Sequence, residues 1–491
     1  MNLSKTRYCK GIQCSKILWL DWHKSEVRDD SIINQRIFDT GNKVGDLAMG
    51  YYSDYTEVPY NVDKSVMIAE TRRLLDAKTS VICEASFSHD SNFCSVDILR
   101  VFDDGVEIVE VKSSTKIDSI YYDDMAFQYH VVASCGLNVR KVSLMHINNK
   151  YERRGELNLQ QFLTVQDCTE KVLSMQDDIK ANIKRLKKAA EAKTEINIEI
   201  GEQCSTPYDC LYRTYCWRHI PKNSVFDISG MQFKKQLALY SRGIISFEQL
   251  LESGEKIGKN ARLQVETKVY NRPPTINKKA VKTFLDSLSW PLYFLDFEGF
   301  QEAIPPYDGL RPYMQTPFQY SLHIQKESGG CLEHREFLAE EGKDPRRSLA
   351  ERLCADIPQT ACVLVYNKVY EKGRIKELAR CFDDLAKHLM NIHNNIKDLM
   401  QPFQSRVYYC REFGGSYSIK QVLPALCPNV TELDYHALDL VHNGDEAMKI
   451  YEELPGKTPE EKKRIRSALL AYCRLDTLAM VRVLEKLQEI K

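Results

Sequence analysis

The fold of the N-terminal part of the chain follows from residues 81–114, which read VICEASFSHDSNFCSVDILRVFDDGVEIVEVKSS. Runs typical of strands lie at 80–87, 94–102 and 106–112. A helical opening precedes them, and a helix, a strand and a long helix are predicted to follow at about 120–135, 139–147 and 167–193. This alternation predicts an α/β domain that covers residues 1–221.

Two carboxylates in this stretch are expected to lie side by side. Asp97 and Glu110 stand on neighbouring runs, and a hairpin would bring them together near the ends of adjacent strands. Because side chains alternate along a strand, Glu110 and Lys112 share one face and Val111 points toward the core. Paired carboxylates suit a hard cation, Mg²⁺ or Mn²⁺, which polarises a phosphate and lowers the pKa of a bound water.

The pattern therefore predicts a site for phosphodiester hydrolysis. Asp97 and Glu110 would be metal ligands, and Lys112 would orient the attacking water or offset charge in the transition state. Glu84 on the preceding strand is a further candidate ligand, and Gln128 on the following helix would orient the lysine or contact the phosphate. The structural alternative is a solvated hairpin with an ordinary Glu–Lys pair.

Three of the 16 cysteines form a local group. Cys204, Cys210 and Cys216 recur every six residues, unlike the C-x2-C spacing of zinc ribbons, and this mildly favours an iron–sulfur cluster over zinc. Either group needs a fourth ligand, for which the N-terminus offers Cys9 and Cys14. The alternative is a set of unrelated buried thiols. A disulfide framework is not expected, because the sequence shows no export signal.

The α/β alternation begins again at residues 286–491, after a helical connector at 222–285. Its first strand lies in WPLYFLDFEGF, and further strands are predicted near 318–325, 333–339 and 361–367. Helices are predicted near 344–356, after 371, and from 460 to the end of the chain. We therefore predict a second α/β domain.

A second set of acidic residues lies in this C-terminal part. Asp296 and Glu298 are two positions apart on an apolar strand, so they share a face, and buried paired carboxylates are costly unless they bind a cation. Tyr472 and Asp476 are four positions apart on a helix and project together. Glu371 follows a buried strand. The set predicts a second metal site.

The N-terminal motif resembles that of the RecB-like branch of the PD-(D/E)XK nucleases, and particularly the iron–sulfur exonucleases of CRISPR adaptation. The match rests on Asp97, Glu110, Lys112 and Gln128 in this order. The resemblance implies a restriction-endonuclease-like fold for residues 1–221. Asp46 stands near the position of the family's metal-binding histidine, and Val132 stands where the family often has a tyrosine.

The same resemblance implies a structural 4Fe–4S cluster. Iron–sulfur members take one cysteine from before the nuclease core and three from after it, so that the cluster joins the two ends. The matching residues are Cys14, Cys204, Cys210 and Cys216.

The C-terminal motif resembles the DEDDy branch of the RNase H-like 3′–5′ exonucleases. Asp296, Glu298 and Asp476 match carboxylates that hold two divalent cations, and Tyr472 matches the tyrosine that orients water. Glu371 stands where the family has an aspartate. The resemblance implies an RNase H-like domain over residues 286–491, and the whole chain resembles an uncharacterised bacterial group that joins the two nuclease types.

Composition limits the other classes of function. Lys+Arg and Asp+Glu both number 68, so no overall basic field marks a nucleic-acid binder, although a local groove is compatible with this balance. Without a membrane span or signal peptide in the sequence, we expect a cytoplasmic protein with no membrane partner. Nothing in the sequence identifies a protein partner.

These observations predict a metal-dependent DNA nuclease. We expect an exonuclease acting on single-stranded or end-containing DNA, in repair or defence. Two alternatives stay open: an adaptor that binds nucleic acid with decayed sites, and an RNA-processing 3′–5′ exonuclease.

Overall fold

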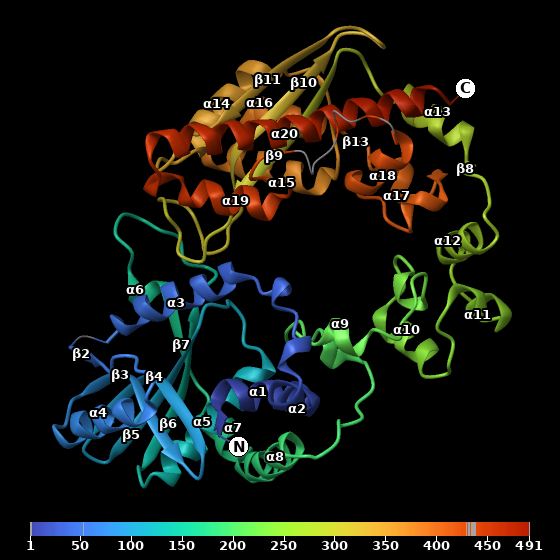
Figure 1. Cartoon of the computed structure of the whole chain (residues 1–491). Helices are drawn as coiled ribbons and strands as arrows, with labels where there is room; N and C mark the ends of the chain where they lie inside the picture. The colour runs from blue at the N-terminus through green and yellow to red at the C-terminus, as the bar shows by residue number, and fades with distance from the viewer. Residues whose placement is uncertain (1, 53, 429, 431–432, 434–437, 491) are drawn as a thin grey trace. The chain divides into compact units, whose positions relative to one another are not determined.

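The computed structural model describes residues 2–52, 54–428, 430, 433 and 438–490. The chain forms two compact units of mixed α/β structure, each built on its own mixed sheet (Figure 1). The first unit comprises residues 1–220 and 302–313, and the second unit comprises residues 221–301 and 314–491.

The first unit contains a curled sheet in the order β2-β3-β4-β5-β6-β7, with the short β1 paired to β4. The strands are β1 (Leu3–Ser4), β2 (Tyr55–Glu57), β3 (Val81–His89), β4 (Asn92–Phe102), β5 (Gly105–Lys112), β6 (Val139–Ile147) and β7 (Leu163–Asp167). β3, β4 and β5 are antiparallel, and β5 and β6 are parallel. The predicted strands β3, β4, β5 and β6 are confirmed.

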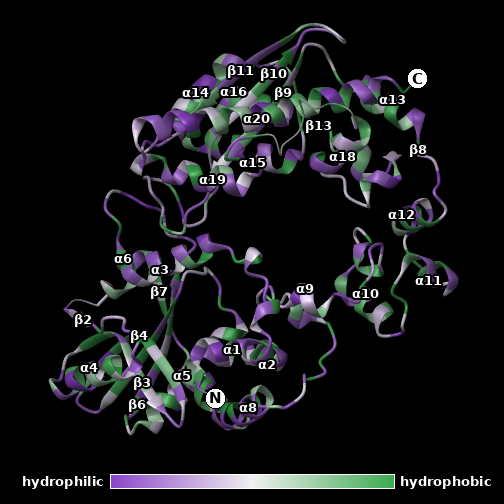
Figure 2. Ribbon diagram, viewed as in Figure 1, coloured by the Kyte–Doolittle hydropathy of each residue, from purple (hydrophilic) through white to green (hydrophobic). Residues whose placement is uncertain are grey.

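Helices cover both faces of this sheet. The helices of the first unit are α1 (Lys5–Gln13), α2 (Ser15–His23), α3 (Gln35–Met49), α4 (Lys64–Asp76), α5 (Ser119–Ser134), α6 (Leu159–Phe162), α7 (Thr169–Ser174), α8 (Gln176–Ala190) and α9 (Arg213–Cys216). Ile82 and Ile108 belong to a core shared with α1, α5 and α8. Val81 and Val109, on the opposite face, belong to a core shared with α3. Figure 2 shows hydrophobic residues along the strands and mixed hydrophilic and hydrophobic residues on α8.

The prediction of one long helix near 167–193 is wrong in one respect. The segment forms two helices, α7 and α8, which are divided at Met175. The Val172 carbonyl, which a continuous helix would pair with the backbone N–H of Gln176, instead accepts from the Gln176 side chain at 3.0 Å. The same side chain donates to the Ala126 carbonyl on α5 at 3.2 Å. A tertiary contact thus competes with helix continuation.

Residues 302–313 leave the second unit between β9 and β10 and pack within the first unit. Ala303 is buried in the core beside α3, and the Tyr313 hydroxyl donates to the Ser113 carbonyl at 2.6 Å. Arg153 donates to the Pro305 carbonyl at 2.8 Å. We call residues 302–313 the strap.

The second unit contains a sheet in the order β11-β10-β9-β12-β13. Its strands are β9 (Leu292–Phe300), β10 (Thr316–Gln325), β11 (Leu332–Leu338), β12 (Cys362–Val365) and β13 (Ile396–Asp398). β9, β10 and β11 are antiparallel, whereas β12 is parallel to both β9 and β13. The predicted strands β9 to β12 are confirmed.

The helices of this sheet form two layers. One face packs on α18 (Ile419–Leu426) and α20 (Pro459–Gln488), and the other on α14 (Arg346–Asp356), α15 (Lys368–Cys381) and α16 (Asp383–Asn394). Two further helices are α17 (Gln401–Gln404) and α19 (Gly444–Glu453). The predicted terminal helix is α20, whose first turn carries a capping box between Thr458 and Glu461.

The region predicted as a helical connector lies within the second unit. It holds α10 (Phe233–Tyr240), α11 (Phe247–Glu252), α12 (Lys259–Val269) and α13 (Lys278–Asp286). A two-residue strand, β8 (Thr275–Ile276), pairs with β14 (Tyr408–Tyr409). None of the helices in the described part of the chain combines the length and apolar character that a membrane span requires.

A histidine pair, with His323 buried and His334 half-buried, joins β10, β11 and α20 in the second unit. His323 Nδ1 lies 2.8 Å from the Thr477 hydroxyl, and His334 Nε2 lies 3.0 Å from the Ser321 hydroxyl. Burial lowers the pKa of His323 to about 3 and that of His334 to about 4. Both rings are therefore neutral in the folded protein at pH 7.

Acid is expected to destabilise the protein through this pair. Below pH 6.5 the unfolded chain binds protons that these two rings do not bind in the folded protein, so stability present above that pH is lost as the pH falls toward 4. His323→Gln should reduce the slope of unfolding free energy against pH by about 1.4 kcal/mol per pH unit in this range. Urea unfolding at a series of pH values measures the slope, and equal slopes for variant and wild type would contradict the assignment.

Candidate metal centres

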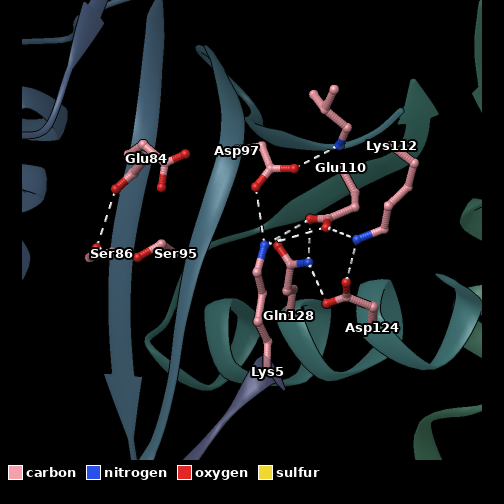
Figure 3. A network of polar contacts seen from close by, with 10 residues as sticks. Lys5, Glu84, Ser86, Ser95, Asp97, Glu110, Lys112, Asp124 and Gln128 are labelled. Carbon is pink, nitrogen blue, oxygen red and sulfur yellow. Dashed lines mark hydrogen bonds and ion pairs between the residues drawn. The ribbon is translucent and has the colours of Figure 1, made fainter. Parts of the chain in front are cut away.

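Six polar residues of the first unit form a continuous network of contacts (Figure 3). One carboxylate comes from β4, and a second carboxylate and a lysine come from β5. A third carboxylate and a glutamine come from α5. A second lysine comes from the start of α1. We call this set the polar cluster: Lys5, Asp97, Glu110, Lys112, Asp124 and Gln128.

The β4–β5 hairpin brings Asp97 and Glu110 together, as the sequence predicts. The ladder pairs Ile98 with Val109, so the next residues, Asp97 and Glu110, face each other. Asp97 accepts a 2.7 Å hydrogen bond from the Val111 backbone N–H. Glu110 is 1% exposed, so its charge depends on the groups around it rather than on water.

Lys112 lies on the same face of β5 as Glu110. Its Nζ donates to Glu110 at 2.5 Å and to Asp124 at 2.8 Å. Asp124 and Gln128 are one turn apart on α5, and the Gln128 amide donates to Glu110 at 2.6 Å and to Asp124 at 3.0 Å. Gln128 therefore orients the two acids that hold the lysine.

Lys5 and Asp124 are members of the polar cluster that were not predicted from the sequence. Lys5 Nζ lies 3.1 Å from Asp97 Oδ1, and 3.3 and 3.2 Å from the two Glu110 carboxylate oxygens. Burial alone lowers the pKa of Lys5, but the carboxylates of Asp97 and Glu110 outweigh it and raise that pKa well above its ordinary value. The pairing of β1 with β4 brings Lys5 next to Asp97 and Glu110. No pattern in the sequence around Lys5 predicts that pairing. For Asp124, the one available signal is its i,i+4 spacing from Gln128.

Glu84 lies on β3, beside the polar cluster. Its φ of 57° is left-handed, and the β3–β4 pairing skips this residue. Burial, followed by repulsion from Asp97, raises the pKa of Glu84 to about 7. Within the described residues, the carboxylates of Glu84, Asp97 and Glu110 do not all come within 4.8 Å of one another. The three acids therefore do not form one tight group in this structure.

Asp46 and Val132, the two positions at which the sequence departs from the RecB-like motif, have different environments. Asp46 is exposed on α3, and in the described structure it has no hydrogen bond or ion pair with the polar cluster. Val132 is fully buried in the core shared with α5 and α8.

All four predicted cluster cysteines line one pocket of the first unit. Cys14 separates α1 from α2, and Cys204, Cys210 and Cys216 follow α8 along the chain. Burial raises the pKa of the Cys210 thiol to about 12, and the other three cysteines contribute to that rise. Cys9, the other candidate, packs against the main core instead.

The distances between the four cysteine sulfurs can be compared with those in a zinc site and in a 4Fe–4S cluster. Tetrahedral zinc, with bonds of about 2.3 Å, would place thiolate sulfurs about 3.8 Å apart. Among the residues that the structure describes, no three of these sulfurs lie within 4.8 Å of one another. In a 4Fe–4S cluster the four thiolates bind separate irons, so a sulfur spacing wider than that of a zinc site is compatible with that group.

In the second unit, three donor groups converge beside β9. Oxygens of Asp296 and Glu298 and the sulfur of Cys473 all lie within 4.8 Å of one another. The Cys473 thiol donates to Asp296 Oδ2 at 3.7 Å. Burial and the neighbouring acids raise the pKa of Asp296 and of Glu298 well above the ordinary range. Cys473 was not predicted as a site residue from the sequence, although it directly follows Tyr472 on α20.

The other predicted residues surround this group. Glu371, in the first turn of α15, is 2% exposed, and its Oε2 has no hydrogen-bond partner. Burial, and then the Asp296 carboxylate, raise the pKa of Glu371. Tyr472 and Asp476 are one turn apart on α20, and burial followed by Asp476 raises the pKa of Tyr472. Glu371 and Asp476 stand outside the 4.8 Å group.

Residues 293–418 match the model of a domain of unknown function, DUF2779. The DUF2779 match starts in β9 and includes Asp296, Glu298 and Glu371, whereas Tyr472 and Asp476 lie beyond its end. No curated protein and no solved structure matches the chain.

The region outside the DUF2779 match contributes a lysine near the acidic group. Lys420 Nζ lies 5.6 Å from the centre of the Tyr472 ring and donates to the His442 carbonyl at 3.0 Å. Its charge lowers the pKa of Asp296 and of Glu298, but less than burial raises them. The site thus gathers acids, a tyrosine and a lysine, groups that suit a cation and a phosphate.

Proposed function

We propose that the protein is a metal-dependent nuclease with two hydrolytic centres, acting as an exonuclease on single-stranded or end-containing DNA. One observation carries the proposal: a single cation, the Lys5 ammonium, contacts both Asp97 and Glu110. The two carboxylates therefore flank one cation position, which a divalent cation would occupy with shorter contacts. The resemblance to RecB-like and DEDDy nucleases supports the same conclusion.

In the first centre, Asp97 and Glu110 would hold Mg²⁺ or Mn²⁺, with Glu84 in support. When bound, the cation would polarise the phosphate and lower the pKa of a water. Lys112 projects from the same face, and Glu110 and Asp124 fix its ammonium. That ammonium would orient the water or stabilise charge on the phosphate.

In the second centre, Asp296, Glu298, Glu371 and Asp476 would hold divalent cations. The unpartnered oxygen of the buried Glu371 supports this assignment, because such an atom is costly unless it has a ligand. Tyr472 would orient the attacking water. The order of three antiparallel and two parallel strands agrees with the RNase H-like fold that the resemblance implies.

For the first unit we propose a restriction-endonuclease-like fold with a structural 4Fe–4S cluster. Its ligands would be Cys14, Cys204, Cys210 and Cys216, which line one pocket. Hydrolysis needs no electron transfer, so the cluster would join the N-terminal helices to the segment after α8.

Degradation of labelled oligonucleotides tests the function. We expect Mg²⁺- or Mn²⁺-dependent shortening of single-stranded DNA, and no shortening with a chelator or with Lys112→Ala and Asp296→Ala combined. No cleavage by the wild type, or equal cleavage by the double variant, would overturn the proposal. Faster degradation of matched RNA would favour the RNA exonuclease, and tight binding without turnover would favour the adaptor.

A further inference from the structure

We propose that the Lys5 ammonium occupies the cation position of the first centre and competes with the divalent cation for it. Metal binding would therefore require the Lys5 side chain to leave. This inference rests on the proposed function, because it concerns how the first centre takes up its metal.

The competition follows from the atoms that Lys5 contacts. Its Nζ lies 3.1 Å from Asp97 Oδ1 and 3.2 Å from Glu110 Oε2, and both carboxylates are the predicted ligands. A divalent cation would bind the same oxygens at about 2.0–2.6 Å. An ammonium and a metal ion cannot occupy one position between the same two carboxylates, so one excludes the other (Figure 3).

Burial explains why a resident cation is needed. The Glu110 side chain is 1% exposed, whereas the side chains of Lys5 and Asp97 are 23% and 22% exposed. A buried carboxylate without a counter-ion is strongly unfavourable. Lys112 is already shared between Glu110 and Asp124, so Lys5 is the second positive charge of the polar cluster and pairs with both ligands.

The location of Lys5 allows it to move away. It is the first residue of α1, whose N-cap is Ser4, and the neighbouring Thr6 and Arg7 are exposed. The cap bond runs from the Arg7 backbone N–H to the Ser4 hydroxyl and does not involve the Lys5 side chain. Rotation of that long side chain would therefore free the Asp97 and Glu110 carboxylates for a divalent cation without disturbing the helix.

Calorimetric titration with Mn²⁺ tests the proposal. All proteins are full-length and carry Asp296→Asn, so that the measured heat reports the first centre. We expect Lys5→Met to bind Mn²⁺ at least about tenfold more tightly than its parent, because no ammonium has to be displaced. We also expect it to melt at a lower temperature in chelator and to regain stability when Mn²⁺ is added.

Two further variants sharpen the test. Lys10→Met removes the same charge from the same helix without touching the polar cluster, and its affinity should match that of the parent. Lys5→Gln keeps a hydrogen-bond donor without the charge, and it should also bind Mn²⁺ more tightly than the parent. It replaces Lys5→Met in the test if that variant does not fold.

The outcomes separate this inference from the proposed function. Equal or weaker Mn²⁺ binding by the Lys5 variants, with clear binding by the parent, would overturn the competition and leave the metal site in place. Absence of Mn²⁺ binding by parent and variants alike would overturn both the competition and the first metal centre.

Discussion

Glu110→Gln is expected to lower metal-dependent DNA cleavage by the first centre at least about 100-fold. Glu110 is the member of the polar cluster that contacts the most partners: Lys5, Lys112 and Gln128 all donate to its carboxylate. A neutral amide of the same shape weakens the predicted metal site and leaves the two ammonium groups less balanced. Cleavage rates and Mn²⁺ calorimetry measure the effect.

Glu107→Gln is the matched control. Glu107 is a second buried glutamate of β5, and it pairs with Arg100 and Ser143 instead of the polar cluster. This variant should lose stability and keep its Mn²⁺ binding. If the two variants lose cleavage equally, the loss reflects folding and the assignment of Glu110 to the site is wrong.

The two centres should also be independent. Asp296→Asn should remove the activity of the second centre and leave that of the first, because the two carboxylate sets lie on separate sheets. If Glu110→Gln or Asp296→Asn removed every activity on every substrate, a composite site or an obligate relay would replace the two-centre proposal. Mn²⁺ binding would distinguish that result from a second centre that is inactive in the natural protein.

Loss of any pocket cysteine is expected to remove the iron. Anaerobically purified protein should be brown and contain about four iron and about four sulfide per chain. Cys14→Ala, Cys204→Ala, Cys210→Ala and Cys216→Ala should each lose the colour, because these four are the thiols that line the pocket among the described residues. The first unit should then melt at a lower temperature.

Cys9→Ala provides the control for this prediction. Cys9 lies near Cys14 in the sequence, but it packs against the core and does not line the pocket. It should therefore keep its iron. Zinc in stoichiometric amount would retain the pocket as a metal site and overturn the iron–sulfur assignment, and iron loss on Cys9→Ala would mean that the ligand set is wrong.

Much of each sheet could be predicted because the signals are local. The alternation around Asp97 and Glu110 fixes which side chains share a face, and the hairpin between them sets their pairing. The i,i+2 spacing of Asp296 and Glu298 similarly predicts their common face. Such patterns depend on neighbours in sequence, which can be seen without the structure.

The missed residues depend on contacts between distant segments. Lys5 reaches Asp97 through the pairing of β1 with β4, and a lysine near the N-terminus carries no sign of it. Cys473 faces Asp296 because α20 packs on β9, whereas its sequence neighbourhood reads as an ordinary buried helix. The division at Met175 arises likewise from a contact between Gln176 and α5.

The strap has a practical consequence for dissecting the protein. The chain crosses from one unit to the other three times, so a single cut near residue 220 does not release a complete first unit. A fragment ending there would lack Ala303 and Tyr313, and would expose apolar surface beside Tyr151 and Phe162. Aggregation of that fragment would reflect the missing strap, and a soluble version would need residues 302–313 joined to its end by a flexible linker.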